Sequence, residues 1–230
     1  MTDTDPSPAI QHTQATEDFL KLVFLFQQSE ERVSTSQLAE ALNITPASVT
    51  EKAKRLSDEG LIDHVPYRGV RLTKEGRRVA LYMIRRHRML EMFLMQHLGY
   101  QWDEVHEEAE RLEHAVSEKF LERVAALLDY PTHDPHGDPI PDSEGLFPDR
   151  AELSLADWPV NKPGRVARIL EQSPETLRYL EDKGLLPDAA VTVEQRSSLE
   201  GVLHLRVGGE VLVIGHPLAL MILVQAPLEG

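Results

Sequence analysis

The chain has 230 residues, 41% hydrophobic and 27% charged, a balance typical of a soluble globular protein with two or three small domains. It contains no cysteine, which excludes disulfides, zinc–thiolate sites and a cysteine nucleophile. We find neither a signal peptide nor an apolar run near the ~20 residues that cross a bilayer, so we expect a cytoplasmic protein with no membrane partner.

The net charge of −14 is unevenly distributed along the chain. Residues 45–88 contain eleven Lys or Arg against five Asp or Glu, a local net charge of +6. Residues 103–144 contain three against thirteen, a local net charge of −10. A basic segment followed by an acidic one favours a DNA-contacting surface joined to a cation-binding or dimer-forming region. Each block taken alone is equally consistent with an ordinary solvated surface.

The N-terminal part predicts a flexible arm followed by three short helices. Residues 1–13 are rich in Thr, Asp, Pro and Ser, as disordered segments are. Apolar residues recur at helical spacing over 14–30, and the run Ser34-Thr-Ser36 caps the next helix. Thr45 and Pro46 are the preferred N-cap and first residue of a third helix.

A β-wing completes this domain. The third helix ends at Gly60, and two short strands flank the turn Tyr67-Arg68-Gly69. Helix, helix, tight turn, helix and wing predict a winged helix-turn-helix over residues 14–75, with the third helix in the major groove of DNA. The alternative is a winged helix used only for protein contacts, and the local charge of +6 favours DNA.

We expect two kinds of DNA contact. The start of the third helix has small or polar residues that suit the groove, and among them Ser48 and Thr50 can reach base edges. This group is Thr45, Ala47, Ser48 and Thr50. Basic residues on the flank of the helix and on the wing suit phosphates. This second group is Lys52, Lys54, Arg55, Arg68 and Arg71.

Residues 76–143 predict a helical domain. One helix spans 74–98 and a second spans 102–128, separated by Gly99 and Tyr100. The following stretch is rich in Pro, Asp, His and Gly and predicts a loop, then a linker over 144–158. His133 and His136 lie in the loop, where we expect solvated side chains rather than metal ligands.

Histidines and carboxylates gather at helical spacing in this domain. His106, Glu110, Glu113 and His114 fall within an arc of about 100° on one helix face, beside the expected buried stripe. His87 and Glu91 repeat the i,i+4 pattern on the preceding helix. Imidazole and carboxylate without thiolate suit Mn(II), Fe(II), Co(II) or Zn(II). The alternative is an ordinary surface of a Glu-rich helix.

The C-terminal part changes to β-structure. Short strands are expected at 164–170, 190–195, 202–207 and 210–214, with Gly208-Gly209 as a hairpin turn. A helix over 173–183 and a last segment at 218–225 complete the set. The pattern predicts a small SH3-like β-barrel over residues 159–228. The predicted fold class is therefore mainly α with a small β part.

The order of these parts resembles the diphtheria-toxin-repressor/manganese-transport-regulator family, in its three-domain form with a FeoA-type C-terminal domain. Four stretches carry the resemblance: Thr-Glu-Asp18-Phe-Leu, Arg-Arg-His87-Arg-Met-Leu-Glu91, Val-His106-Glu-Glu-Ala-Glu110-Arg-Leu-Glu113-His114 and Gly137-Asp-Pro-Ile-Pro141. The resemblance implies a homodimeric, metal-dependent transcriptional repressor of metal-uptake genes. A two-fold dimer would read a pseudo-palindromic operator in double-stranded DNA.

The resemblance also implies two metal sites. The primary site would be Asp18, Glu110, Glu113 and His114. The ancillary site would be His87, Glu91 and His106, completed by Glu171 of the barrel with Gln172 behind it.

Metal preference follows from two of these positions. The iron-responsive branch has a thiolate-bearing residue in place of Glu110 and a thioether in place of Asp18, and replacing sulfur by oxygen favours Mn(II), with Fe(II) as the alternative. Lys21 departs from the manganese branch, which has a carboxylate there for a second, paired ion.

Two other functions remain open on the residues alone. A di-metal carboxylate enzyme also uses His and Glu pairs on helices, but it needs four helices around a substrate cavity. A winged-helix regulator that senses an organic ligand would leave the His and Glu cluster merely structural. We expect no enzymatic activity, because the winged helix and the barrel take up the chain that such a cavity would require.

Overall fold

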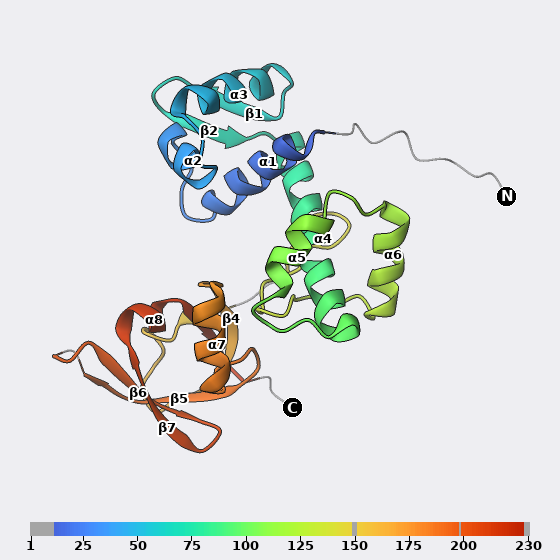
Figure 1. The fold of residues 1–230 in the computed structure, drawn as a ribbon. Coiled ribbons are helices and arrows are strands. Elements are labelled where there is room, and N and C mark those ends of the chain that lie inside the picture. The colour runs from blue at the N-terminus through green and yellow to red at the C-terminus, as the bar shows by residue number, and fades with distance from the viewer. Residues whose placement is uncertain (1–11, 149–150, 198, 228–230) are drawn as a thin grey trace. The chain divides into compact units, whose positions relative to one another are not determined.

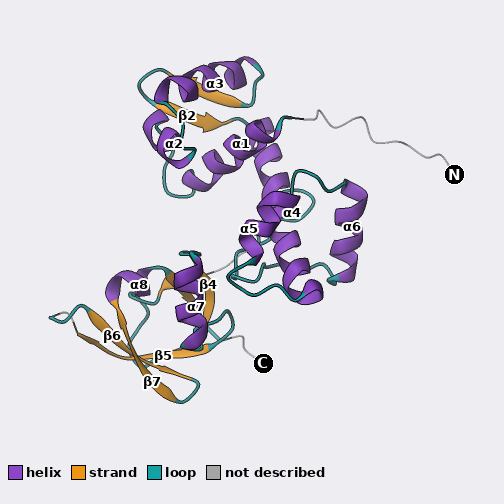
Figure 2. Ribbon diagram, in the orientation of Figure 1, coloured by secondary structure: helices purple, strands orange, loops and turns teal. Residues whose placement is uncertain are grey.

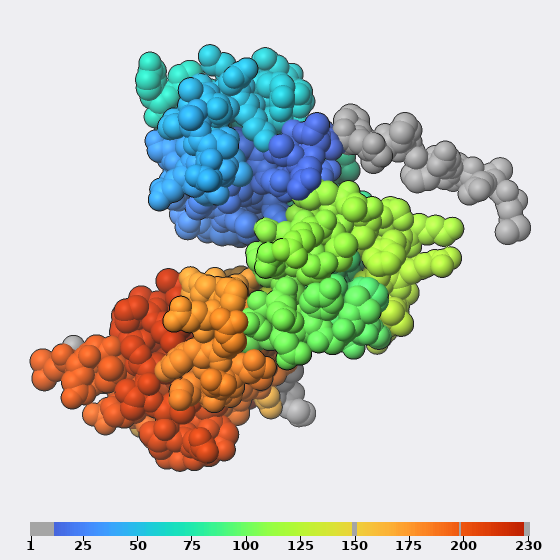
Figure 3. Space-filling model, in the orientation of Figure 1, coloured from blue at the N-terminus to red at the C-terminus, as the bar shows by residue number. Residues whose placement is uncertain are grey.

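The computed structural model describes residues 12–148, 151–197 and 199–227. The chain divides into two compact units, Met1–Arg85 and Arg86–Gly230, and the boundary falls inside the long helix α4, Lys74–Leu98. Figures 1 and 3 colour both units by residue number. Most of the predicted arm, residues 1–11, lies outside the described residues.

The first unit is a winged helix-turn-helix. Its elements before α4 are α1 Gln14–Phe26, α2 Thr35–Ala41, α3 Pro46–Asp58, β1 Ile62–Val65 and β2 Gly69–Leu72. Ser34 and Gln37 form a capping box at the start of α2, and the Thr45 side chain accepts a hydrogen bond from the Ser48 amide at the start of α3. These caps supply partners for amides that a helix start leaves unpaired, so both predicted starts are confirmed.

The wing is an antiparallel pair in which Ile62 faces Leu72 and Val65 faces Gly69. A third backbone segment joins it, because Val33 and Val70 exchange two hydrogen bonds of 2.9 Å. This contact connects the segment before α2 to the wing, so the helix-turn-helix and the wing pack against each other.

The prediction of a single helix over residues 102–128 is wrong. The structure has two helices, α5 Val105–Leu112 and α6 Glu118–Leu127, separated by a turn. Ser117 has extended backbone angles, and its side chain accepts a hydrogen bond from the Phe120 amide, so a new helix begins there. Glu113 and His114 therefore lie after α5 rather than on it.

The C-terminal part of the second unit is an antiparallel six-stranded sheet in the order β3-β8-β4-β5-β6-β7. Figure 2 shows its strands in orange. Its elements are β3 Leu153–Ser154, β4 Pro163–Ile169, α7 Pro174–Asp182, β5 Ala190–Ser197, β6 Val202–Val207, β7 Glu210–Gly215, α8 His216–Leu220 and β8 Ile222–Gln225. The last segment expected, 218–225, is the end of α8 followed by β8.

The barrel core extends into chain expected elsewhere. Leu155 and Trp158 are buried in it, although they fall within the stretch expected to be linker, and β3 begins at Leu153. Trp102, from the segment before α5, is buried in the same core. The helical part and the barrel of this unit therefore share apolar contacts. Within the described residues no helix is long and apolar enough to cross a membrane.

The close approach of Val33 to the wing gives a stability prediction. Gly69 has φ +89°, and a Cβ built there would lie 2.2 Å from the Val33 carbonyl oxygen. We expect Gly69→Ala to lower the free energy of unfolding of the first unit by roughly 2–4 kcal/mol, from backbone strain plus a clash with backbone. Denaturant unfolding followed by circular dichroism measures this loss.

Gly60→Ala is the matched control. Gly60 also has positive φ, +74°, but within the described residues a Cβ added there would meet no atom within 4 Å beyond its own chain neighbours. Strain alone should cost about 1 kcal/mol. Equal losses for the two variants would contradict the assigned role of the Val33 contact.

Candidate metal centre

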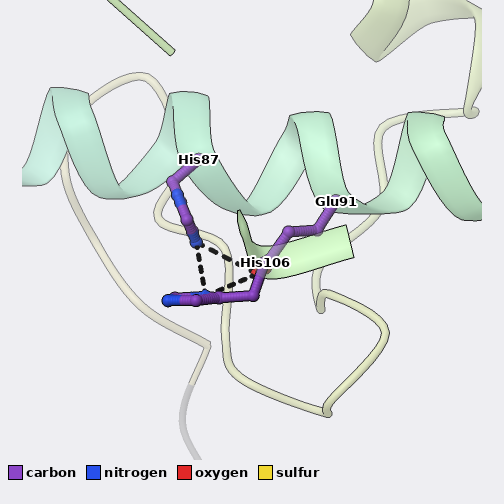
Figure 4. A group of neighbouring side chains, drawn as sticks. All are labelled: His87, Glu91 and His106. Atoms are coloured by element: carbon purple, nitrogen blue, oxygen red, sulfur yellow. Dashed lines mark hydrogen bonds and ion pairs between the residues drawn. The ribbon is translucent and has the colours of Figure 1, made fainter. Parts of the chain in front are cut away.

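The centre is built around Glu91, a carboxylate that is 1% exposed on α4. Its Oε1 lies 3.0 Å from His87 Nε2 and 3.1 Å from His106 Nδ1. These two ring nitrogens are themselves 3.1 Å apart. Figure 4 shows both imidazoles converging on the carboxylate, His87 from the preceding turn of α4 and His106 from α5. The structure thus brings together the three residues expected to form the ancillary site.

The hydrogen bond made by the second ring nitrogen of His87, Nδ1, fixes the tautomer of this side chain. His87 Nδ1 lies 2.6 Å from Glu113 Oε2, and Glu113 is 1% exposed. Because an ionised carboxylate only accepts, Nδ1–H is the donor, and Nε2 keeps a lone pair directed at Glu91 when the ring is neutral. This is the arrangement in which a second carboxylate orients a metal-binding imidazole.

His136 also belongs to this centre, and the expectation that it is a solvated loop residue is wrong. It is fully buried, and its ring stacks on Trp102 with a centroid separation of 5.7 Å. Its Nε2 lies 3.0 Å from the Trp102 carbonyl oxygen, to which Nε2–H donates. Nδ1 makes no hydrogen bond within the described chain and lies 4.0 Å from Glu91 Oε1. A buried nitrogen with a free lone pair is what a cation would satisfy.

Asp134 adds a second buried carboxylate. Its Oδ1 accepts hydrogen bonds from the amides of His136 at 2.8 Å and Asp138 at 2.9 Å, which fold the loop into a tight turn. One ligand atom each from Glu91, Asp134 and His136 lies within 4.8 Å of the others. No helical spacing marks Asp134 or His136, so the search for ligands on helix faces missed both. The available signal was the short Asp134-Pro-His136-Gly137 run of the kind that forms tight polar turns.

Burial and neighbouring charges shift the pKa values of the buried groups in different directions. Burial alone would raise the pKa of Glu91, but the charge of His87 and hydrogen bonds from His106 and His87 lower it well below its usual range. Burial, together with the charges of Glu91 and Asp138, raises the pKa of Asp134 well above its usual range. Burial lowers the pKa of His136, which keeps that imidazole neutral and able to ligate.

The donor set fits a divalent transition metal. Two candidate ligand groups share the Glu91 carboxylate: one adds His87 and His106, and the other adds Asp134 and His136. The chain offers no sulfur ligand apart from methionine. Such a set suits Mn(II), Fe(II), Co(II) or Zn(II). A bound divalent cation would offset the two buried carboxylates and use the free lone pair of His136.

Of the residues expected in the primary site, three lie in the second unit. Glu113 Oε1 lies 3.4 Å from His114 Nε2, while its other oxygen binds His87, so one carboxylate touches histidines of both expected sites. The Glu110 side chain is 53% exposed, with Oε1 3.7 Å from His106 Nε2. Asp18 lies half-buried on α1 of the first unit.

Glu171 lies apart from this cluster. It is exposed, and its Oε1 accepts a hydrogen bond from the Ser173 amide at the start of α7. Gln172 donates instead to Asp138 Oδ2 at 2.8 Å. Neither side chain joins the ligand group gathered around Glu91.

The residues expected to contact DNA lie on α3 and the wing. Thr45, Ala47 and Ser48 are exposed, and Thr50 is half-buried with its hydroxyl donating to the Pro46 carbonyl. Among the basic residues, the exposed ones are Lys54, Arg55, Arg68 and Arg71. Arg71 pairs with Asp63 at 2.9 Å, and Lys52 is half-buried against α1.

Comparison with known protein families identifies the class to which this architecture belongs. Residues 11–70 match the iron dependent repressor N-terminal DNA binding domain, and residues 73–142 match the metal binding and dimerisation domain of the same family. Residues 153–226 match the FeoA domain. The chain belongs to the iron-dependent repressor family, whose members are DNA-binding, dimer-forming regulators and not enzymes. The predicted family and fold class are confirmed.

Individual relatives cover most of the chain. The iron-dependent repressor IdeR of Mycobacterium tuberculosis is 32% identical over 218 residues, 89% of this chain and 94% of the relative. A solved structure described as a manganese-dependent transcriptional repressor in complex with manganese is 40% identical, with a TM-score of 0.84, and the match covers 92% of this chain and 100% of that one. The structure of ScaR with bound Cd²⁺ is 32% identical, with a TM-score of 0.78 and coverage of 92% and 99%.

The raised pKa of Asp134 predicts how the stability of the cation-free protein changes with pH. A carboxyl group whose pKa is higher in the folded state binds its proton more tightly there, so stability increases as pH falls from neutrality through that raised pKa towards the usual value of 3.8. Asp134→Asn is neutral at every pH and lacks this dependence. We therefore expect Asp134→Asn to be more stable than wild type at pH 7, with a difference that shrinks by up to about 1.4 kcal/mol per pH unit on acidification.

Tryptophan fluorescence in the presence of a chelator measures this difference, because Trp102 and Trp158 both lie in the barrel core of the second unit. The lowered pKa of Glu91 makes stability decrease as pH falls, but this contribution is present in both proteins and largely cancels in their difference. A difference that stays constant or widens on acidification would show that Asp134 is ionised in the folded protein.

Proposed function

We propose that the protein is a homodimeric repressor, activated by Mn(II), that binds operator DNA of metal-uptake genes in the cytoplasm. The observation that carries the proposal is that one chain contains both a winged-helix domain and two candidate ligand groups that share the buried Glu91. Oxygen and nitrogen donors without thiolate favour Mn(II), with Fe(II) as the second candidate. The manganese-dependent repressors among the solved relatives support the same order.

The activating cation is proposed to connect two parts of the chain. Asp18 precedes the recognition helix in the first unit, whereas Glu110, Glu113 and His114 belong to the second. A cation that takes ligands from both would hold α3 in one orientation. In a dimer this favours one spacing of the two recognition helices, a population shift rather than a new fold.

Glu113 is proposed to couple the two cation sites. Its Oε2 orients His87 of the buried centre, and its Oε1 faces His114. Filling the buried centre would fix His87 and hence the Glu113 carboxylate in the geometry that the second site requires. The buried centre is thus assigned a supporting role and the site with Asp18 the switching role.

The DNA-contacting surface is proposed to comprise the start of α3 and the wing. Ser48 and Thr50 are assigned to base edges, with Thr45 and Ala47 beside them. The exposed basic residues Lys54, Arg55, Arg68 and Arg71 are assigned to phosphates. Two copies of this surface in a two-fold dimer would recognise a pseudo-palindrome.

The proposed function is tested by titrating Mn(II) into cation-free protein with and without an operator fragment. Saturable Mn(II) binding that tightens DNA binding supports it. If neither Mn(II) nor Fe(II) changes DNA binding, the protein would instead be a winged-helix regulator of another kind.

Removal of a switching ligand should uncouple DNA binding from the cation. We expect Glu110→Ala or His114→Ala to bind operator in the presence of Mn(II) only as well as cation-free wild type, because α3 is no longer fixed. Fluorescence anisotropy with labelled operator measures this, and analytical ultracentrifugation should show that the dimer persists. His216→Ala, an exposed histidine of the barrel, is the control. An operator affinity that still rises with Mn(II) in either ligand variant would refute the assignment.

The wing gives a second prediction on DNA binding. Arg68 is exposed in the wing turn, and we expect Arg68→Ala to weaken binding to every sequence. The salt dependence of the logarithm of the affinity should fall by about 1.8, about 0.9 for each subunit of the dimer, because fewer counterions are released. Arg165→Ala, an exposed arginine of the barrel, should leave both quantities unchanged. A loss confined to the specific operator, with the wild-type salt dependence, would rule out a phosphate contact.

A further inference from the structure

Lys52, in the middle of the recognition helix α3, differs from the basic residues around it. Lys54 and Arg55 are exposed, whereas Lys52 is half-buried. Its ammonium donates a hydrogen bond to the carbonyl oxygen of Ala15 in the first turn of α1. The same ammonium lies 5.3 Å from the centroid of the Phe19 ring, within the range of a cation–π contact. The side chain is therefore directed at α1 and makes contacts within the protein.

The surface of α1 that receives Lys52 is the one that bears Asp18. Ala15, Asp18 and Phe19 stand at positions i, i+3 and i+4, which share one face of a helix. Burial and the neighbouring charge of Arg55 lower the pKa of Lys52, and the negative charge of Asp18 acts in the opposite direction. The Lys52 ammonium thus lies within the electrostatic influence of the Asp18 carboxylate.

We propose that Lys52 is an internal counter-ion of Asp18 that competes with the activating cation and so sets the Mn(II) concentration at which the protein responds. The proposal rests on the assignment of Asp18 as a ligand of that cation. A lysine ammonium cannot ligate, and it repels a divalent ion held on the same carboxylate. The role differs from a phosphate contact, because it acts on cation binding in the absence of DNA.

The size of the effect follows from Coulomb's law. For a doubly charged ion about 6 Å from the ammonium in a water-like dielectric, the repulsion weakens cation binding about ten-fold. Screening at physiological ionic strength, where the Debye length is about 8 Å, reduces this to about three-fold. The opposing effect is that the contacts with Ala15 and Phe19 connect α1 to α3, so loss of the whole side chain would also loosen the packing.

The test therefore replaces Lys52 by Met, which keeps the apolar stem over Phe19 and removes the charge. Isothermal titration of Mn(II) into cation-free protein, without DNA, should show about three-fold tighter binding for Lys52→Met at physiological ionic strength and a larger gain at low salt. Lys52→Arg should bind Mn(II) nearly as wild type does. Lys54→Met, which removes an exposed lysine two residues further along α3, is the matched control and should not change Mn(II) binding. The melting temperatures of the cation-free proteins show whether each variant is folded.

DNA binding of the Mn(II)-saturated variants separates the two roles of a basic residue. Lys52→Met should keep the wild-type salt dependence of operator binding, whereas Lys54→Met should lower it by about 1.8, about 0.9 for each subunit of the dimer. Mn(II) binding by Lys52→Met that is unchanged or weaker would overturn the proposal. A fall in its salt dependence equal to that of Lys54→Met would also overturn it, in favour of a phosphate contact.

A double-mutant cycle with Asp18→Ala identifies the carboxylate involved. The gain in Mn(II) affinity from Lys52→Met should vanish when Asp18 is absent, because no carboxylate then holds the cation beside the ammonium. A gain that persists overturns the counter-ion role alone. If Asp18→Ala by itself binds Mn(II) with wild-type stoichiometry and affinity, the assignment of Asp18 as a ligand fails and the proposal fails with it. The two failures are therefore distinguishable.

Discussion

The hydrogen bond between the buried Glu113 carboxylate and His87 is the interaction on which the cation-binding region depends. A carboxylate that is 1% exposed is costly unless each oxygen has a partner, and here Oε2 faces His87 at 2.6 Å and Oε1 faces His114 at 3.4 Å. His87 in turn directs its other nitrogen to Glu91. Glu113 is the C-cap of α5, and its amide donates to the Ala109 carbonyl at 2.9 Å, so the end of this helix holds the carboxylate in position.

The same centre forms the junction between the helical part and the barrel of the second unit. The His136 carbonyl accepts a hydrogen bond from the Ile169 amide of β4, and Asp138, two residues later, pairs with Arg168 at 3.1 Å. A Cβ at Gly137 would lie 2.0 Å from the Ala167 carbonyl oxygen, so the loop and the strand are in backbone contact. The loop that supplies a ligand nitrogen is thus held in place by the barrel, which links the position of the barrel to the geometry of the centre.

Sequence periodicity predicted the candidate ligands that lie on helices and missed those that lie in a loop. His87 and Glu91 are one helical turn apart, so their spacing alone placed them on one face, and the structure brings His106 to them. Asp134 and His136 lie in an irregular loop, where the direction of a side chain depends on hydrogen bonds such as those accepted by Asp134 and on tertiary contacts with Trp102. The single helix over 102–128 failed for a related reason, because an extended residue at Ser117 interrupts a pattern whose apolar spacing continues across the turn.

Charge balance in the buried centre indicates how a cation can enter it. Without a cation, the raised pKa of Asp134 favours its neutral, protonated form, whereas His87 and His106 hold the pKa of Glu91 low. Ligation requires neutral imidazoles and ionised carboxylates, so a divalent cation would displace the Asp134 proton and offset the charges of the two carboxylates. Two ring nitrogens are already oriented towards a cation. Glu113 accepts the proton of His87 and the Trp102 carbonyl accepts that of His136, both on the side facing away from Glu91. Little reorganisation of these side chains then remains for a bound cation to drive.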